Sequence, residues 1–141
     1  MLKSEAYDRL LQNGIKPSIQ RIEIMQYLLE HRTHPTVDDV YKGLCKKIPT
    51  LSRTTVYNTL RLLSDNNAAQ IITIDEHRVC YDGEIKPHVH FYCKQCKTIV
   101  DIQDNLNIDC KKYICGNSID CIQLYYRGVC SSCLEKNKKI K

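Results

Sequence analysis

The fold is decided by the stretch LSRTTVYNTLRLL, residues 51–63. Ser52 is a favourable N-terminal cap, because its hydroxyl accepts a hydrogen bond from an N–H group of the first helical turn. Val56, Leu60 and Leu63 recur at helical spacing and form an apolar face that must pack against other elements. The stretch therefore predicts an amphipathic helix. Its opposite face carries polar side chains at neighbouring helical positions: Arg53, Thr54, Tyr57, Asn58 and Arg61.

Three further helices are predicted upstream of this stretch. Ser4 and Ser18 are the expected N-terminal caps of the first two, and Asn13-Gly14 ends the first. Thr36 and Asp39 approximate a capping box at the start of the third. The apolar side chains of these helices recur every three or four residues and are expected to face the core. They are Ala6, Leu10, Leu11, Ile19, Ile22, Met25, Leu28, Leu29, Val37, Val40, Tyr41 and Leu44.

The third and fourth helices, joined by a short turn, resemble a helix-turn-helix, whose second helix enters the major groove of DNA. A polar helix face is more often simply solvated, so this pattern alone does not decide the function. Residues 70–74 and 78–81 alternate with period 2 around a turn, which predicts a β-hairpin. Helices followed by a hairpin are typical of a winged helix, which favours DNA binding. Lys16 and Arg21 lie near helix starts, where they can meet phosphates.

The composition fits one ordinary domain or two small ones. The chain has 141 residues, 26% charged and 43% hydrophobic, and a net charge of +5 that favours an anionic partner. Neither a membrane-spanning run nor a signal-peptide profile is seen, so we expect a cytoplasmic protein with no membrane partner. The nine cysteines are an odd number, so they cannot all pair within one chain. Cysteine-rich cytoplasmic chains more often bind metal.

Two Cys-x-x-Cys pairs form the clearest chemical motif, Cys93 with Cys96 and Cys130 with Cys133. Four thiolates close a tetrahedral zinc shell with no open position, so we expect a structural zinc site. Lys94 and Lys97 are placed to offset its negative charge. The alternatives are a redox Cys-x-x-Cys pair or buried free thiols.

A second set of possible ligands is more scattered. In a strand, His88 and His90 project to one face, and Asp82 and Asp101 lie in the short segments on either side. Together with His34, these imidazoles and carboxylates suit Fe(II), Mn(II) or Zn(II). Spacing alone is weak evidence, because such residues are often ordinary surface. His31 and His77 are expected to be solvated.

The second half of the chain otherwise predicts short strands around the cysteine pairs, with a helix over about 104–115. We therefore expect an α+β protein. Residues 1–81 would form a winged helix-turn-helix domain that binds DNA, and residues 82–141 a small α/β domain for dimerisation and metal binding.

These motifs together resemble the ferric uptake regulator (Fur) family of bacterial metal-dependent repressors, over nearly the whole chain. The matching strings include Thr33-His34-Pro35, Thr55-Val56-Tyr57-Asn58 and the segment from Gly14 to Arg21, besides His-x-His and both cysteine pairs. The resemblance implies that residues 52–65 are the recognition helix, with Tyr57 and Arg61 facing DNA. It also implies that Lys16 reaches towards a minor groove and that the C-terminal half dimerises.

Within the family, Asp82 and Asp101 resemble the carboxylate ligands of the peroxide-responsive repressor (PerR-like) branch, where iron-sensing members commonly have Glu. That branch implies a regulatory Fe(II) or Mn(II) site of His34, Asp82, His88, His90 and Asp101. Because His34 lies in the DNA-binding half, the metal would clamp the two halves at a fixed angle. With Fe(II), hydrogen peroxide is expected to oxidise His34 or His88 and release the clamp. Mn(II) would clamp without that reaction.

The chain also departs from the family pattern. Val89 and Cys121-Ile122 stand where many members have ligands of an additional metal site, so that site is expected to be absent. Ser18-Ile19 departs from the usual string before Arg21, which puts the phosphate contact of Arg21 in doubt. The remaining cysteines are interpreted as buried small hydrophobic residues, with accessory thiol sensing as the alternative. They are Cys45, Cys80, Cys110, Cys115 and Cys121.

The sequence thus predicts a homodimeric, metal-dependent repressor, not an enzyme, that responds to peroxide stress. Its cofactors would be structural zinc and regulatory iron or manganese, and its partner a double-stranded, AT-rich, pseudo-palindromic operator. An iron-responsive or zinc-responsive repressor is the alternative within the family. Outside it, the alternatives are a Cys-x-x-Cys thiol oxidoreductase and a zinc-ribbon interaction module.

Overall fold

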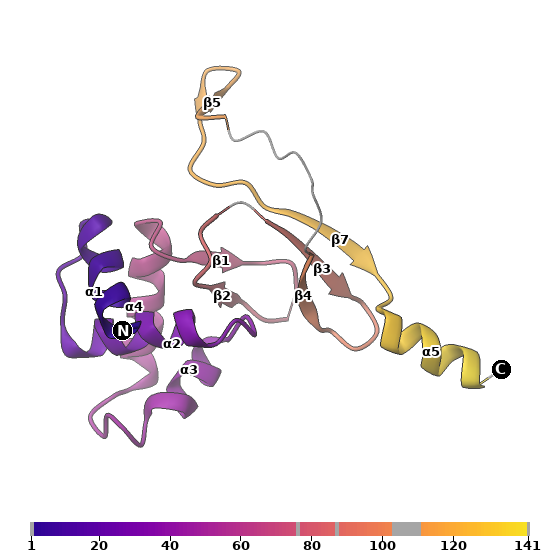
Figure 1. The fold of residues 1–141 in the computed structure, drawn as a ribbon, viewed down its shortest axis with the longest axis horizontal. Helices are drawn as coiled ribbons and strands as arrows, with labels where there is room; N and C mark the ends of the chain where they lie inside the picture. The colour runs from indigo at the N-terminus through magenta and orange to yellow at the C-terminus, as the bar shows by residue number, and fades with distance from the viewer. Residues whose placement is uncertain (1, 76, 87, 103–110, 141) are drawn as a thin grey trace. The chain divides into compact units, whose positions relative to one another are not determined.

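The computed structural model describes residues 2–75, 77–86, 88–102 and 111–140, and the chain divides into two compact units, residues 1–85 and 86–141 (Figure 1). The division follows Ile85. The boundary that we predicted from the sequence, after Tyr81, falls inside the last strand of the first unit. In the described residues, no helix is long and apolar enough to span a bilayer.

The first unit contains the predicted helices and hairpin. Its elements are α1 (Leu2–Gln12), α2 (Ile19–Glu30), α3 (Val37–Leu44), α4 (Arg53–Asp65), β1 (Gln70–Ile72) and β2 (Cys80–Asp82). The two strands pair antiparallel, with Gln70 opposite Asp82 and Ile72 opposite Cys80. The expected α+β class and the order of helices followed by a hairpin are therefore confirmed.

Short polar side chains start three of these helices as predicted. The Ser18 hydroxyl accepts from the N–H of Arg21 (3.2 Å), and the Ser52 hydroxyl accepts from the N–H of Thr55 (3.1 Å). Thr36 and Asp39 form a complete capping box. The predicted cap at Ser4 is wrong, because α1 already begins at Leu2 and Ser4 lies inside it. Leu and Lys are favourable helix residues, so the helix extends past the expected start.

The core of the first unit is made by the inward faces of all four helices. The inward face predicted for α4 is confirmed, since Val56, Leu60 and Leu63 are fully buried. Each such side chain contributes about 1.5–3 kcal/mol relative to an exposed one. Ile19 and Leu11 were predicted to face the core and are exposed instead, at 78% and 51%. Ile19 is the first residue of α2, and the buried residues of this helix begin only one turn later, at Glu23.

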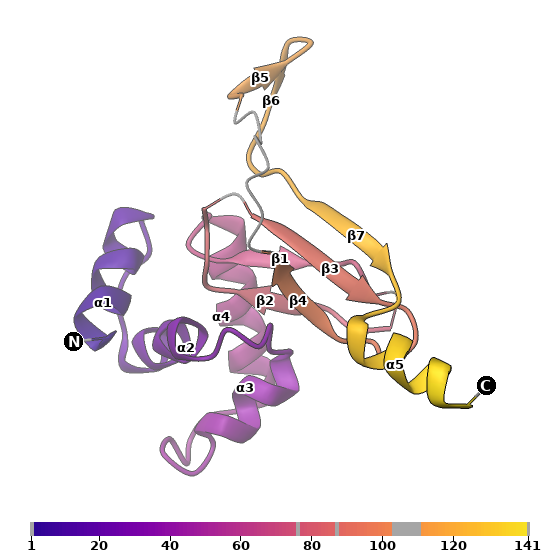
Figure 2. The ribbon, with the colours of Figure 1, turned by 45° about the vertical axis from the view of Figure 1, so that its right-hand side comes forward.

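The second unit is built on a three-stranded sheet. Its elements are β3 (Val89–Cys93), β4 (Ile99–Ile102), β5 (Tyr113–Ile114), β6 (Asn117–Ser118), β7 (Leu124–Gly128) and α5 (Ser131–Ile140). The strand order is β4-β3-β7, so β3 lies between its two partners (Figure 2). β3 pairs antiparallel with β4 and parallel with β7. This arrangement brings the two cysteine pairs to the same end of the sheet.

The helix predicted over 104–115 is wrong in its last residues. Tyr113 and Ile114 form β5, which pairs with β6 in a small hairpin; residues 103–110 lie outside the described residues. The loop residues Cys115 and Gly116 both have positive φ, 49° and 80°. Two central residues with positive φ are the requirement of a type I′ turn, which closes a hairpin and cannot continue a helix.

Candidate metal centres and nucleic-acid interface

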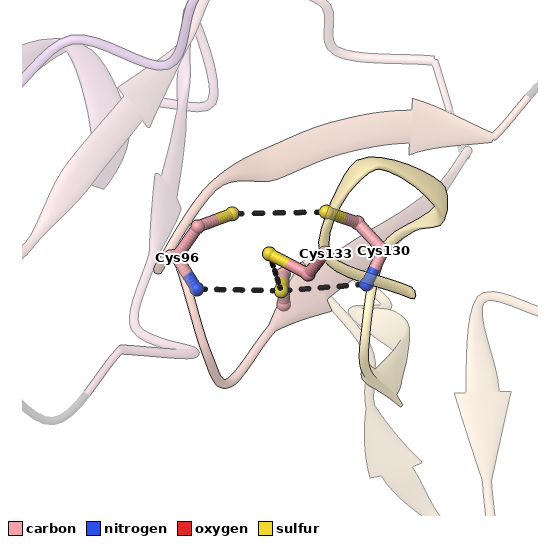
Figure 3. A group of neighbouring side chains, drawn as sticks. Cys96, Cys130 and Cys133 are labelled. Atoms are coloured by element: carbon pink, nitrogen blue, oxygen red, sulfur yellow. Dashed lines mark hydrogen bonds between the residues drawn. The ribbon is translucent and has the colours of Figure 1, made fainter. Parts of the chain in front are cut away.

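The four predicted cysteine ligands converge in the second unit. Cys93 ends β3, and Cys96 lies in the turn that leads to β4, where Lys97 has a positive φ of 67°. Cys130 and Cys133 stand at the start of α5, and the parallel pairing of β3 with β7 sets Gly128 opposite Cys93. Figure 3 shows Cys96, Cys130 and Cys133 pointing toward one another.

The distances between the sulfurs match a tetrahedral zinc shell. Cys93 and Cys133 are 3.8 Å apart at Sγ, as are Cys96 and Cys130, and all four sulfurs lie within 4.8 Å of one another. A tetrahedron with Zn–S bonds of about 2.3 Å has edges of about 3.8 Å. A disulfide would require about 2.05 Å. The residues present therefore fit a structural zinc ion.

Local hydrogen bonds favour the thiolate at part of this site. The backbone N–H groups of Cys96 and Cys130 each donate to the Cys93 sulfur at 3.4 Å and lower the pKa of Cys93 to about 6. The Thr98 hydroxyl, 3.1 Å from the Cys96 sulfur, lowers the pKa of Cys96. Burial, followed by the neighbouring sulfurs, raises the pKa of Cys133 to about 12. A bound cation would supply the positive charge that full ionisation of this crowded set requires.

A second cluster in the same unit joins His88, His90 and Asp101. The β3–β4 register sets His90 directly opposite Asp101, and His88 precedes β3 by one residue. The same oxygen, Asp101 Oδ1, lies 3.4 Å from His88 Nε2 and 3.3 Å from His90 Nε2. The imidazole rings are 4.3 Å apart, so the prediction that both project to one face is confirmed.

The tautomer of His88 follows from its backbone contact. His88 Nδ1 lies 2.8 Å from the carbonyl oxygen of Lys86. A carbonyl only accepts, so Nδ1 carries the proton and Nε2 of the neutral ring keeps its lone pair. This is the usual way in which an outer hydrogen bond orients a metal-binding histidine.

The first unit holds the other two predicted ligands, His34 and Asp82. Their side chains are buried and approach to 3.5 Å between His34 Nε2 and Asp82 Oδ2. The backbone N–H of Tyr81 donates to the carbonyl of Pro35 at 2.9 Å, which fixes the His34 segment beside β2. His34 has φ 57° and precedes a proline, a combination that costs conformational energy. Such strain persists only where the surrounding structure holds the residue in place.

The His88–His90–Asp101 group and the His34–Asp82 pair both offer the nitrogen and oxygen donors that a hard or borderline divalent ion prefers. Contacts of 3.3–3.5 Å between imidazole nitrogen and carboxylate oxygen are longer than ordinary hydrogen bonds. They are close to the separation of about 3.0–3.5 Å between ligands that share an ion at about 2.1 Å. No thiol is among them, so they suit iron or manganese as well as zinc. His31 and His77 are exposed, as predicted.

The predicted DNA-contacting face of α4 is exposed over its whole length. Tyr57 is 47% exposed, and Thr54, Asn58 and Arg61 are also exposed. Arg53 is held away from this role by its own unit, since its guanidinium pairs with Asp38 (2.9 Å) and lies 4.3 Å above the ring of Tyr41. No local pattern predicts this ion pair, because Asp38 belongs to another helix, α3.

A groove of about 470 Å³ joins α4 to the start of α2. It is lined by three of the predicted DNA-contacting residues, Lys16, Arg21 and Asn58, and also by Gln20 and Thr55, which the sequence reasoning did not assign. Arg21 Nη1 donates to the backbone carbonyl of Lys16 at 2.8 Å, so the Arg21 guanidinium is fixed beside the Lys16 backbone despite the unusual Ser18-Ile19. The groove presents positive charge beside the exposed face of α4.

The remaining cysteines have different environments. Cys80 is buried, as expected for a small hydrophobic residue, and Cys45 is half-buried. Cys115 and Cys121 are exposed, so the interpretation as buried hydrophobic residues is wrong for both. Each belongs to the segment around the β5–β6 hairpin, whose side chains are mostly exposed. Cys110 lies outside the described residues.

Comparison with known proteins gives a consistent result. The family model described as "Ferric uptake regulator family" matches residues 12–125. The chain is 32% identical over 136 residues to the peroxide operon regulator of Bacillus subtilis (strain 168), covering 94% of this chain and 93% of that protein. It is 36% identical over 99 residues to the peroxide-responsive repressor PerR of Staphylococcus aureus (strain Mu50), covering 70% of this chain and 67% of that protein.

The fold also has solved counterparts. The ferric uptake regulator Fur of Helicobacter pylori, described as having three functional metal-binding sites, matches with a TM-score of 0.69 at 18% identity. The match covers 94% of this chain and 93% of that one. At this identity the likeness concerns the fold alone.

Proposed function

The chain belongs to the ferric uptake regulator family of metal-dependent transcriptional repressors, and from this premise we propose that it represses its operators until hydrogen peroxide inactivates it. The observation that carries the proposal is the donor set of the His/Asp groups. Both carboxylates are aspartates, and all the candidate ligands outside the cysteine site are nitrogen or oxygen donors.

DNA binding is assigned to the first unit. Members of the family bind DNA and act as dimers. The N-terminal two turns of α4 would enter the major groove, with Tyr57, Asn58 and Arg61 nearest the bases and Thr54 beside them. Lys16 and Arg21 would contact the backbone or a minor groove, which is supported by their common groove with Asn58. Arg53 would join them only after leaving Asp38. The operator would be AT-rich and pseudo-palindromic, to match a homodimer.

The two metal sites would have different roles, one structural and one regulatory. Zinc on Cys93, Cys96, Cys130 and Cys133 would stabilise the second unit, which carries dimerisation. Fe(II) or Mn(II) would be held by His34 and Asp82 from the first unit and by His88, His90 and Asp101 from the second. Because its ligands come from both units, this ion would favour one arrangement of the units and so shift the population towards the DNA-binding form.

Peroxide sensing would depend on which ion is bound. Bound Fe(II) would supply the redox chemistry that cleaves the O–O bond of hydrogen peroxide and would be regenerated in the net change, whereas Mn(II) would not supply it. The net change would convert one C–H of the His34 or His88 imidazole and one hydrogen peroxide into C–OH and water, so that one peroxide oxygen stays on the ring and the other leaves as water. An oxidised ring is a poorer ligand, so the two units would no longer be held and the operator would be released.

Operator binding by anaerobic protein loaded with Fe(II) or with Mn(II), before and after a small excess of hydrogen peroxide, tests the proposal. We expect only the Fe(II) form to release DNA, with the mass of one oxygen added to a peptide containing His34 or His88. Protein that needs metal yet ignores peroxide in both forms would instead be an iron-, manganese- or zinc-responsive repressor. Binding that needs no metal would contradict the proposal.

A thiol oxidoreductase is disfavoured by the same cysteine geometry. Its reactive thiolate must be accessible, whereas the Cys93 thiol, whose pKa is lowered to about 6, is buried. The exposed Cys96, whose pKa is also lowered, lies 3.8 Å from Cys130 at Sγ, which is the spacing of two ligands of one ion. Alkylation of the native protein distinguishes a structural zinc site from a thiol oxidoreductase, because zinc-bound thiolates resist labelling until a chelator is added.

A further inference from the structure

The segment that follows Asp82 is anchored by a residue with no role so far, Arg9 on α1. Arg9 Nη1 donates to two backbone carbonyls, those of Ala68 (2.9 Å) and Gly83 (2.8 Å). Ala68 lies between α4 and β1, and Gly83 follows β2 directly. One guanidinium therefore joins the first helix to the open end of the hairpin, where Asp82 stands opposite Gln70.

The contact between Arg9 and Gly83 is linked to Asp82 by a single rigid group, the peptide between Gly83 and Glu84. The carbonyl of Gly83 and the N–H of Glu84 belong to the same planar peptide and point in opposite directions. The N–H of Glu84 donates to Asp82 Oδ1 at 2.9 Å. Arg9 therefore binds the carbonyl oxygen of this peptide, and the N–H group of the same peptide binds the Asp82 carboxylate. A charged donor on the carbonyl also polarises the N–H and strengthens its bond to the carboxylate.

This arrangement gives the two oxygens of Asp82 different tasks. Oδ1 is tied to the backbone N–H of Glu84, and Oδ2 lies 3.5 Å from His34 Nε2. Rotation of the 83–84 peptide would withdraw the N–H and remove one of the contacts that orient the carboxylate. The orientation of that peptide thus helps to direct Oδ2 towards His34.

The glycine at position 83 is required for the peptide to lie where it does. A Cβ added there would come within 3.0 Å of the carbonyl oxygen of Leu28 in the last turn of α2. Glu84 is fixed in turn by a 3.0 Å ion pair with Arg32. The peptide is packed against α2, and the Arg9 guanidinium donates to its carbonyl.

We infer that Arg9 is a positioning residue for Asp82, acting through the 83–84 peptide to hold the carboxylate ready for the regulatory metal. The inference rests on the proposed function, because it takes Asp82 as a ligand. Outer-sphere partners of metal ligands typically contribute about 10–100-fold to metal affinity. Arg9 is expected to have an effect of that size, although it lies on α1, an element that carries none of the proposed ligands.

The test compares full-length, zinc-loaded variants for Mn(II) binding, followed by electron paramagnetic resonance. Arg9→Met should weaken Mn(II) binding about 10–100-fold and change the spectrum of the bound ion, while its zinc content stays that of the wild type. Lys47→Met is the matched control. It breaks a 2.8 Å ion pair with the buried Glu23 in the same unit, and so tests the effect of lower stability alone.

The outcomes separate the inference from the proposed function. Wild-type protein that binds no Mn(II) beyond its zinc, or Asp82→Asn protein that binds Mn(II) as the wild type does, would overturn the metal assignment itself. Wild-type-like affinity in Arg9→Met would overturn the positioning role alone, and so would an equal loss in Lys47→Met at a matched unfolding midpoint. A loss and a changed spectrum in Arg9→Met only would support it.

Discussion

Each of the two units is stabilised internally by a different kind of interaction. The first has an extensive apolar core drawn from all four helices and the hairpin, in which Leu10, Ile24, Leu28, Val56 and Leu60 are almost fully buried. Among the described residues of the second, the buried hydrophobic side chains are Val89, Tyr92, Cys93, Ile99 and Cys133. Two of these are cysteines of the proposed zinc site. A unit with so little core needs a cross-link, and a metal ion supplies one.

Because the two units differ in this way, different treatments should destabilise them. The first should respond to changes in packing and be indifferent to chelators, whereas the second should respond to the loss of zinc. The His/Asp groups belong to neither core, so their loss should change metal binding without unfolding either unit.

The largest effect is expected from the zinc site. Cys96→Ser should abolish zinc retention and unfold the β3–β4–β7 sheet, because structural zinc contributes about 10–16 kcal/mol in small zinc-dependent folds. Hydrogen exchange should show β3 and β7 losing protection while α2 and α4 keep theirs. Cys121→Ser, an exposed cysteine outside the cluster, is the control. Continued protection of β3 in Cys96→Ser protein would mean that the second unit does not depend on zinc.

The core of the first unit should give the next largest effect. Leu60 is fully buried, so Leu60→Ala should destabilise this unit by about 2–5 kcal/mol through lost burial and the cavity left behind. Denaturant unfolding followed by α-helical signal measures the change, and zinc content should stay constant. Leu11→Ala, at an exposed position of α1, should change stability by less than about 0.5 kcal/mol. Zinc loss in Leu60→Ala would show that the units are not independent.

The His/Asp cluster should separate metal binding from stability. Asp101→Asn removes the carboxylate that faces both His88 and His90, so Mn(II) affinity should fall by about 100-fold or more. Equilibrium competition against a metal-binding dye measures this, with unfolding midpoints recorded in parallel. Asp120→Asn, an exposed carboxylate outside the cluster, should bind Mn(II) normally. An unchanged affinity in Asp101→Asn would remove the cluster from the regulatory site.

The smallest effect concerns the cap that follows the His34 segment. Thr36→Ala removes the hydroxyl that accepts from the N–H of Asp39, which should cost the first unit about 1 kcal/mol. Thr36→Ser keeps the hydroxyl and should restore most of the stability. Mn(II) affinity should change little in either variant, because the cap holds α3 and not the imidazole. A large loss of Mn(II) affinity in Thr36→Ala alone would show that the cap also fixes His34.

Local patterns explain most of what could be predicted. Caps at Ser18, Thr36 and Ser52 depend on residues three positions apart, so the sequence reveals them directly. The same holds for the apolar face of α4 and for the spacing within each Cys-x-x-Cys pair. The helix predicted over 104–115 failed at Tyr113 and Ile114 because helical spacing of a few apolar residues does not exclude a strand. The positive φ of Cys115, an uncommon conformation for that residue, gave no warning in the sequence.

The chemistry of this protein is evident from its residues alone: four thiols in two pairs, a separate set of imidazoles and carboxylates, and a helix with a polar face that follows three helices with apolar faces. These depend on residue type and short spacing, which do not change on folding. Only the tertiary structure decided which atoms meet. The register that sets His90 opposite Asp101, the ion pair that occupies Arg53 and the contact from Arg9 to Gly83 all join residues distant in the chain. Such contacts arise from packing between elements, and no local pattern encodes them.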